Sequence, residues 1–159
     1  MFNLVLFEPE IPPNTGNLIR LAANLGAHLH LVEPLGFSLD IKSVRRAGLD
    51  YHDLTRVSTH ENLEACFDKL LTPGVQLFAC TTKGRVTHVN ASYRENDVLL
   101  FGPETRGLPE SVREDSRVTA TVRLPMCEGN RSLNLANAVS IISYEAWRQN
   151  GFAGATNPC

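Results

Sequence analysis

Three short polar groupings carry the side chains of this 159-residue chain that are best suited to chemistry. They are NTGNLIR at 14–20, ETR at 104–106 and SLN at 132–134. Each is expected where a loop enters a helix, so the first and third could simply provide helix caps, and the second a local ion pair. One such grouping would be weak evidence, but three in so small a chain indicate a functional site.

Several common enzyme motifs are absent from the sequence. Gly102 and Gly107 bracket a tight turn, but no Gly-Lys-Ser/Thr follows it, and no G-x-G-x-x-G leads into a long helix. There is no G-x-S-x-G, and the five histidines are scattered. His28 and His30 lie on a predicted strand, where core or surface roles are the usual ones. We therefore expect no phosphate-binding loop, no hydrolase triad and no metal.

The four cysteines are widely spaced and include no C-x-x-C pair. This spacing is typical neither of a zinc site nor of a disulfide framework. We expect free, mostly buried thiols at Cys66, Cys80, Cys127 and Cys159.

The composition is that of a soluble globular protein, with 43% apolar and 20% charged residues. We expect a single domain over residues 1–159, with a flexible tail from about residue 151. No apolar run is long enough to cross a membrane, and the first residues lack the basic flank of a signal peptide. The expected location is the cytoplasm.

The charge balance limits how the chain could bind nucleic acid. A net charge of −2 argues against bulk electrostatic attraction. However, 12 of the 15 basic residues are arginine, whose planar fork suits phosphate. A local arginine patch around Arg45 and Arg46 is therefore one interpretation, and a solvated helix face is the other.

Short apolar segments alternate with helical patterns along the chain. The predicted strands are residues 3–7, 29–32, 54–58, 75–80, 98–101 and 118–124. The predicted helices are a helix from Asn14 to Gly26, then 41–49, 61–71, a turn at 109–114, and 134–149. This alternation predicts an α/β domain with a mainly parallel sheet and helices on both sides.

Ligands of parallel sheets bind beyond the carboxyl ends of the strands. Three segments in such positions are rich in small, polar or turn-forming residues, namely 81–84, 102–107 and 125–132. We expect the site to be built from these segments.

The last helix is apolar on more than one side. Leu135, Val139 and Ile142 belong to one stripe, while Ile141 and Tyr144 extend the apolar character around the helix. A surface helix is usually apolar on one face only. We therefore expect this helix to bury a second face against another copy of the chain, the alternative being a helix enclosed within one subunit.

Longer strings in the sequence resemble a known family. The SPOUT superfamily of RNA methyltransferases, in its 2′-O-ribose branch, is matched in order by NTGNLIR, FGPETRGLP and LPMCEGNRSLNLANAVSIISYEAW. The subgroup of small tRNA enzymes that methylate the wobble ribose is matched by EPEIPPNTGNLIRLAAN, RRAGLDYHD, TTKG and YEAWRQ. The resemblance runs through the whole chain.

This resemblance implies a Rossmann-like parallel α/β sheet whose C-terminal part forms a deep trefoil knot. It implies S-adenosyl-L-methionine bound in the knot, no metal, and a homodimer formed through the C-terminal helix. The implied reaction methylates the ribose 2′-hydroxyl of cytidine or modified uridine at position 34, in the anticodon stem-loop of tRNA, with leucine tRNAs as the expected substrates.

The resemblance also implies residue roles. The family's catalytic arginine matches Arg20, which we expect to clamp the phosphate beside the target ribose, because a guanidinium stays protonated and is a poor base. The residues expected to orient Arg20 and the ribose are Asn14, Glu104, Ser132 and Asn134. The expected cofactor contacts are Cys80, Gly102, Leu124, Met126, Ser132 and Leu133. The expected RNA contacts are Arg45, Arg46, Arg106 and Arg131.

Three alternatives remain open at this stage. The first is a ribose methyltransferase acting on ribosomal RNA or on another tRNA position, although members with such targets often carry an extra RNA-binding domain. The second is a knotted protein that binds RNA without catalysis, which the presence of the whole polar set argues against. The third is a nucleotide-dependent α/β enzyme with an unfamiliar loop.

Overall fold

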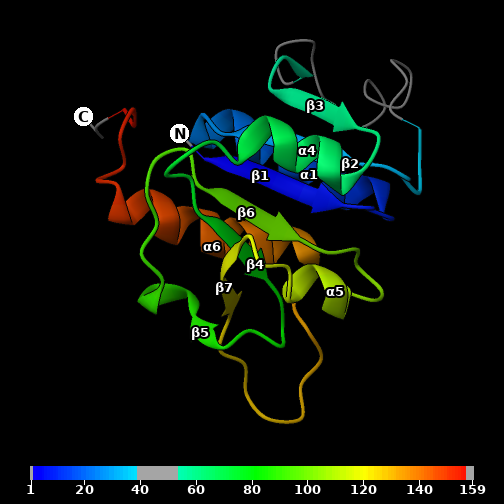
Figure 1. Ribbon diagram of the computed structural model, residues 1–159. Helices are drawn as coiled ribbons and strands as arrows, with labels where there is room; N and C mark the ends of the chain where they lie inside the picture. Colours follow the sequence, from blue (N-terminus) through cyan, green and yellow to red (C-terminus); the bar gives the residue numbers. More distant parts are fainter. Residues whose placement is uncertain (1, 39–53, 157–159) are drawn as a thin grey trace.

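The computed structural model describes residues 2–38 and 54–156. Within these residues, one seven-stranded sheet has the order β3-β2-β1-β6-β4-β7-β5 (Figure 1). Every recorded strand pair is parallel. The strands are β1 (Asn3–Phe7), β2 (His28–Val32), β3 (Val57–His60), β4 (Leu77–Cys80), β5 (Val86–Thr87), β6 (Val98–Phe101) and β7 (Val118–Arg123).

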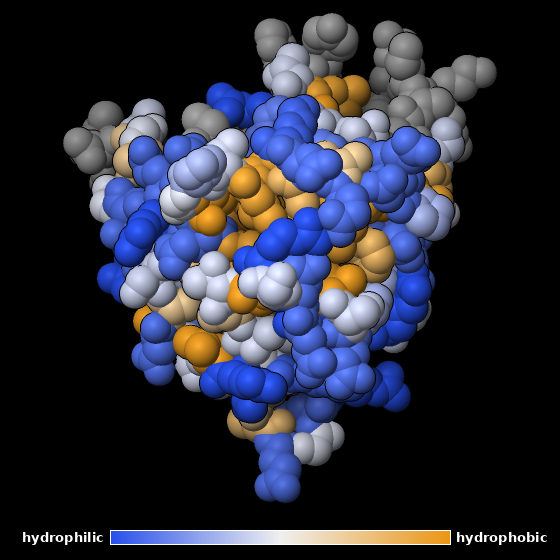
Figure 2. Space-filling model, viewed as in Figure 1, coloured by the Kyte–Doolittle hydropathy of each residue, from blue (hydrophilic) through white to orange (hydrophobic). Residues whose placement is uncertain are grey.

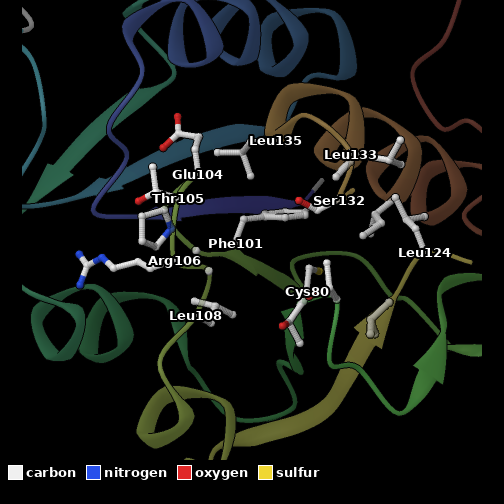
Figure 3. A pocket seen from close by; sticks show the side chains of 18 of the residues that line it. Cys80, Phe101, Glu104, Thr105, Arg106, Leu108, Leu124, Ser132, Leu133 and Leu135 are labelled. Atoms are coloured by element: carbon white, nitrogen blue, oxygen red, sulfur yellow. The ribbon is translucent and has the colours of Figure 1, made fainter. Parts of the chain in front are cut away.

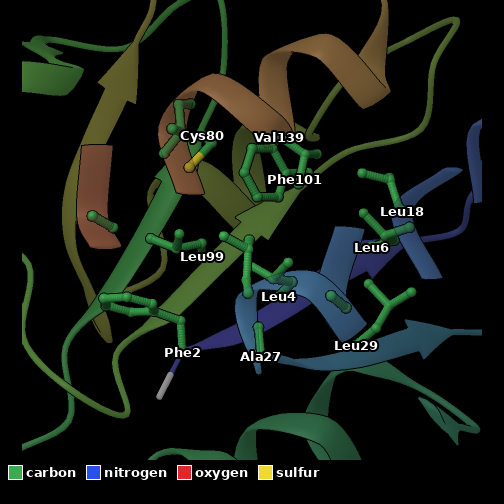
Figure 4. Packing of buried hydrophobic residues seen from close by; sticks show 14 of the residues in the cluster. Phe2, Leu4, Leu6, Leu18, Ala27, Leu29, Cys80, Leu99, Phe101 and Val139 are labelled. Atoms are coloured by element: carbon green, nitrogen blue, oxygen red, sulfur yellow. The ribbon is translucent and has the colours of Figure 1, made fainter. Parts of the chain in front are cut away.

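Helices cover both faces of the sheet, as the alternating pattern predicts. They are α1 (Pro12–Leu25), α4 (Leu63–Leu70), α5 (Glu110–Arg113) and α6 (Leu135–Gln149), with a short 3₁₀ helix, η1 (His88–Asn90), between β5 and β6. The helices α1 and α6 pack on one face, where Leu18 and Val139 meet the strand residues Leu4 and Leu99 (Figure 4). The helices α4 and α5 lie on the other face. The prediction of a parallel sheet between two helical layers is confirmed.

The first helix begins earlier than expected. The sequence favours Asn14 or Thr15 as its N-cap, but α1 starts at Pro12 after Ile11, which contributes no side-chain cap. Proline is well suited to the first turn of a helix, because its φ is already helical and its missing N–H would have no partner there. The expected cap is therefore wrong, and Asn14 is a buried residue inside the first turn.

Other boundaries differ by a few residues. The strand predicted at 54–58 is shifted to β3 (Val57–His60), where the chain pairs in register with β2. The helix α4 is shorter than predicted, because the side chain of Asn62 caps it by accepting a hydrogen bond from Ala65 N–H at 2.9 Å. Neither β5 nor η1 was expected, since two- and three-residue elements are too short to show periodicity. The helix predicted at 41–49 lies outside the described residues.

The end of the described chain turns back on α6. Trp147 Nε1–H donates to the carbonyl of Ala153 at 3.0 Å, and the rings of Trp147 and Phe152 lie 5.3 Å apart. The flexible tail and the single-domain assignment stay predictions.

Hydrophilic side chains surround separate apolar patches on the face that carries α4 and α5 (Figure 2). No described helix combines the length and apolar character that a membrane crossing requires.

Candidate active site

A pocket of about 260 Å³ lies beyond the carboxyl ends of β4, β6 and β7. Its walls come from the segments that follow these strands and from the start of α6 (Figure 3). The floor includes Phe101, which also belongs to the main hydrophobic core. The pocket is thus fixed to the centre of the sheet, at the edge where the sequence predicts a site.

The structure brings all six predicted cofactor residues to this pocket. The lining includes Cys80, Gly102, Leu124, Met126, Ser132 and Leu133. Sequence reasoning missed other lining residues, among them Phe101, Leu108 and Ile142. Burial raises the pKa of the Cys80 thiol well above its usual range, so this side chain is an uncharged wall group.

Three of the predicted catalytic residues form a hydrogen-bonded chain beside the pocket. Asn134 Nδ2 donates to Asn14 Oδ1 at 2.9 Å, and Asn14 Nδ2 donates to Glu104 Oε1 at 3.1 Å. Asn134 also caps α6, because its Oδ1 accepts from the backbone N–H of Ala136 at 2.8 Å. These contacts join the first turns of α1 and α6 to the loop after β6.

The Glu104 carboxylate binds the two residues that lead into α1. It accepts hydrogen bonds from the backbone N–H groups of Glu10 at 2.8 Å and Ile11 at 3.1 Å. The partial positive charge at a helix N-terminus favours a carboxylate at this position. Glu104 therefore holds the loop after β6 against the start of α1, and its oxygens are engaged by protein donors.

Two further carboxylates, which sequence reasoning missed, reinforce this connection. Glu10 accepts from the Thr105 hydroxyl at 2.8 Å and from its backbone N–H at 3.1 Å, and Glu8 pairs with Arg106. The available signal was their place directly after β1. Because β1 and β6 are adjacent parallel strands, the segments that follow them meet at the same edge.

Gly102 is required by its own loop. A Cβ at this position would lie 2.3 Å from the backbone nitrogen of Leu108 and 2.4 Å from the carbonyl carbon of Gly107. The loop closes this tightly partly because Gly107 has a left-handed φ of 65° and its N–H donates to the carbonyl of Pro103 at 2.9 Å. Gly102 also lines the pocket, so the shape of the site depends on this close backbone contact.

The predicted arginines occupy different places. Arg106 lines the pocket and pairs with Glu8, with 55% of its side chain exposed. Arg20 lies on the exposed side of α1 and Arg131 is exposed on the loop before α6, and neither is part of the pocket lining. Arg45 and Arg46 lie outside the described residues. Arg20 is thus not a wall residue of the pocket in its own chain.

The sequence agrees with a family of known enzymes over most of its length. The model of the SpoU rRNA methylase family matches residues 1–144. The chain belongs to the SpoU rRNA methylase family. Among its relatives is a tRNA (cytidine(34)-2'-O)-methyltransferase of Methylovorus glucosotrophus (strain SIP3-4), which is 57% identical over 98% of this chain and 99% of the relative.

Solved structures agree with this membership of the SpoU family. One, described as giving insights into the 2-OH methylation of C/U34 on tRNA, has a TM-score of 0.86 and 46% identity, covering 96% of this chain and 97% of the other. Another is the SpoU methyltransferase AviRb of Streptomyces viridochromogenes in complex with AdoMet, with a TM-score of 0.80 and 28% identity over 95% of this chain and 61% of AviRb. The parallel α/β fold of this chain is therefore that of SpoU methyltransferases, while the trefoil knot stays a prediction.

Proposed function

We propose that this chain is an S-adenosyl-L-methionine-dependent methyltransferase that methylates the ribose 2′-hydroxyl of the wobble nucleotide, C34 or U34, of tRNA. The observation that carries this proposal is the pocket, whose walls include all six residues expected to hold the cofactor. The support from relatives is the 57% identical enzyme, which matches this chain almost end to end.

The chemistry of the pocket fits this cofactor. Its walls combine apolar side chains, including Leu124, Leu133 and Ile142, with uncharged hydroxyl groups such as that of Ser132. The one cationic side chain in its lining, Arg106, is already paired with Glu8. A nucleoside without phosphates suits such walls, whereas a dinucleotide would leave its charged phosphates without partners. The cofactor, when bound, supplies an activated methyl group on a sulfonium.

The polar chain beside the pocket acts as a positioning unit in this proposal. The groups of Asn14, Glu104 and Asn134 hydrogen-bond to one another or to helix ends, so they fix the pocket walls. Ser132 is exposed and lines the pocket, so in this proposal its hydroxyl contacts the ribose. Holding the two reactants in attack geometry can supply much of the rate, on the order of 7–11 kcal/mol at best.

Arg20 is assigned to the RNA in this proposal. Its guanidinium binds the phosphate next to the target ribose, and the hydroxyl proton leaves to that phosphate or to water. Because Arg20 is not part of the pocket lining of its own chain, we assign it to the pocket of the partner in a homodimer, or to an RNA surface shared by both chains.

The finer parts of the proposal concern topology and surroundings. We assign the trefoil knot to the segments around 102–108 and 124–134, which both line the pocket. We assign the dimer contact to α6, on which Ile141 and Tyr144 are exposed. We place the enzyme in the cytoplasm with the anticodon stem-loop of leucine tRNAs as its substrate.

The decisive experiment is nucleoside mass spectrometry. The chain is incubated with S-adenosyl-L-methionine and tRNA, and the modified nucleotides are mapped to their positions. A 2′-O-methylated nucleotide at position 34 is expected. Methylation of ribosomal RNA or of another tRNA position would contradict the substrate, and the absence of methylation together with RNA binding would identify a binding protein.

A calorimetric titration separates the cofactor from its rivals. S-adenosyl-L-methionine is expected to bind the purified chain, and NAD is not. Binding of NAD alone would replace the methyltransferase proposal with that of a nucleotide-dependent enzyme.

A further inference from the structure

A group of histidines and one cysteine lies on the α4 side of the sheet, in the half remote from the pocket. His30 of β2, His60 of β3 and Cys66 of α4 are all buried, and one ligand atom of each lies within 4.8 Å of those of the other two. The strands β2 and β3 stand on the far side of β1 from the pocket strands β6, β4 and β7. The proposed methyl transfer uses none of these three side chains.

Hydrogen bonds determine which nitrogen of His30 carries its proton. Asn3 Nδ2 donates to the carbonyl of Asn96 at 3.0 Å, which turns Asn3 Oδ1 toward His30 Nε2 at 3.2 Å. Because Oδ1 can only accept, Nε2 must carry the hydrogen. His30 Nδ1 then has a lone pair, which faces His60 Nε2 at 2.9 Å.

This arrangement around His30 is the one that metal-binding histidines use. Such a histidine donates its second ring N–H to an oxygen, and this fixes the tautomer and aims the other nitrogen at the ion. Asn3 provides that oxygen from β1, the strand next to β2, where its register partner is His28. A buried cysteine near the same lone pair adds a ligand of the kind that soft metal ions prefer.

We propose that His30, His60 and Cys66 form a binding site for one late first-row metal ion that favours nitrogen and sulfur ligands, Zn²⁺ or Cu⁺. The ligand atoms are His30 Nδ1, His60 Nε2 and Cys66 Sγ. Two imidazoles and one thiolate suit these ions better than they suit Mg²⁺ or Ca²⁺, which take oxygen ligands. Bound there, the ion links β2, β3 and α4.

Binding changes the protonation of two ligands. The Cys66 thiol loses its proton to solvent, and His60 moves its proton from Nε2 to Nδ1, while His30 keeps its tautomer. One proton is therefore released for each ion bound. Burial raises the pKa of the Cys66 thiol to about 12, which opposes this step. Lys69, one turn further along α4, favours the thiolate but also repels the cation. The positive charge of Arg56 lowers the pKa of the neighbouring His28.

The test measures how much metal the full chain retains. Protein stripped with a chelator is mixed with Zn²⁺, or with Cu⁺ in a parallel anaerobic arm, and passed over a gel-filtration column. Elemental mass spectrometry is expected to give about one ion per chain in at least one arm. Cys66→Ala and His60→Gln are expected to lose at least about nine-tenths of it. Cys127→Ala, which removes an exposed thiol outside the group, should retain it.

A spectroscopic measurement on the unmutated chain tests the site without relying on variants that could fail to fold. Co²⁺ bound by Cys66 is expected to produce a thiolate-to-metal charge-transfer band that Zn²⁺ abolishes. If the unmutated chain retains no more of either ion than Cys66→Ala does, the three side chains form only hydrogen bonds and the proposal is overturned. If Zn²⁺ is the retained ion and Co²⁺ gives no such band, Cys66 is not a ligand and the proposed site is wrong. Methylation of tRNA and binding at this site are measured separately, so either can fail alone.

Discussion

The contacts of Asn14 differ from those that its residue type and position in the sequence predict. Asn14 is read from the sequence as a helix cap or a catalytic amide. In the structure it is buried inside the first turn of α1, where it links Asn134 to Glu104. Both amide atoms of Asn14, Oδ1 and Nδ2, therefore already take part in a hydrogen bond within the protein. Its amide instead determines how two helices and one loop meet at the pocket.

Replacing Gly102 tests whether the loop or the ligand requires a glycine there. In Gly102→Ala the new Cβ would overlap backbone atoms of Gly107 and Leu108, so the loop must move. We expect the free energy of unfolding to fall by about 1–3 kcal/mol and the affinity for S-adenosyl-L-methionine to fall with it. Urea unfolding and calorimetry measure the two effects.

The control for this variant is Thr82→Ala, which alters another residue of the pocket lining without a buried clash. We expect it to leave the stability unchanged. Normal stability of Gly102→Ala combined with lost cofactor binding would show that Gly102 makes room for the ligand alone.

Arg20 offers a second test at the scale of one side chain. Because it is absent from the pocket lining, Arg20→Ala should abolish methylation while the cofactor Kd changes by less than about threefold. Arg20→Lys keeps the charge but loses the planar fork, so it should recover only part of the rate. Single-turnover assays and calorimetry provide the measurements. Turnover near that of the unmutated chain in Arg20→Ala would remove this residue from the mechanism.

At the scale of elements, hydrophobic pattern predicts what is local. The strand β6 has the predicted bounds, and Gly26 ends α1 with a φ of 66° as expected. What pattern could not predict depends on contacts between distant segments. The chain that leads into α1 is held by Glu104, 94 residues beyond Glu10, and the pairing of β2 with β3 brings His30 to His60. No periodicity along the chain records such contacts.

In metal-free protein, the buried histidines make the stability of the packed elements β2, β3 and α4 depend on pH. Burial, aided by the nearby His28 and His60, lowers the pKa of His30 to about 3 from 6.5. The folded state keeps the ring neutral, while the unfolded state protonates it. The contribution of His30 to the free energy of unfolding is therefore fully present above about pH 6.5 and is lost as the pH falls toward 3. Each such histidine contributes a slope of up to about 1.4 kcal/mol per pH unit.

Urea unfolding at pH 7 and pH 5 in the presence of a chelator checks this expectation. This pH range lies above the titration of the Glu145 carboxylate. Arg148 holds the pKa of that carboxyl at about 2, so its contribution to the free energy of unfolding is lost only in stronger acid. His30→Gln retains hydrogen-bonding groups without titrating, and it should show a smaller loss between the two pH values. Equal stability of the unmutated chain at both pH values would contradict a neutral His30 in the folded state.

At the scale of the whole molecule, the expected RNA contacts coincide only in part with the pocket, whose lining includes Arg106. Arg20 and Arg131 are exposed outside the pocket lining, and the net charge of the chain is −2. RNA binding must then rely on a few local arginines. Because each phosphate contact releases counterions, the affinity for tRNA should fall steeply as salt is raised. Joining two chains would bring more of these arginines onto one surface.

The exposed apolar side of α6 is the surface we assign to that dimer, and Tyr144 tests it. Ile141 and Tyr144 are 43% and 47% exposed, and the Tyr144 ring packs 5.7 Å from Trp147. Tyr144→Glu would place a charge where an apolar contact is expected, so sedimentation velocity should show monomers and methylation should be lost. Tyr144→Phe keeps the apolar face and should remain dimeric and active. If Tyr144→Glu still sediments as a dimer, or if the unmutated chain is a monomer, then α6 is not the interface and Arg20 cannot reach the pocket of a partner through it.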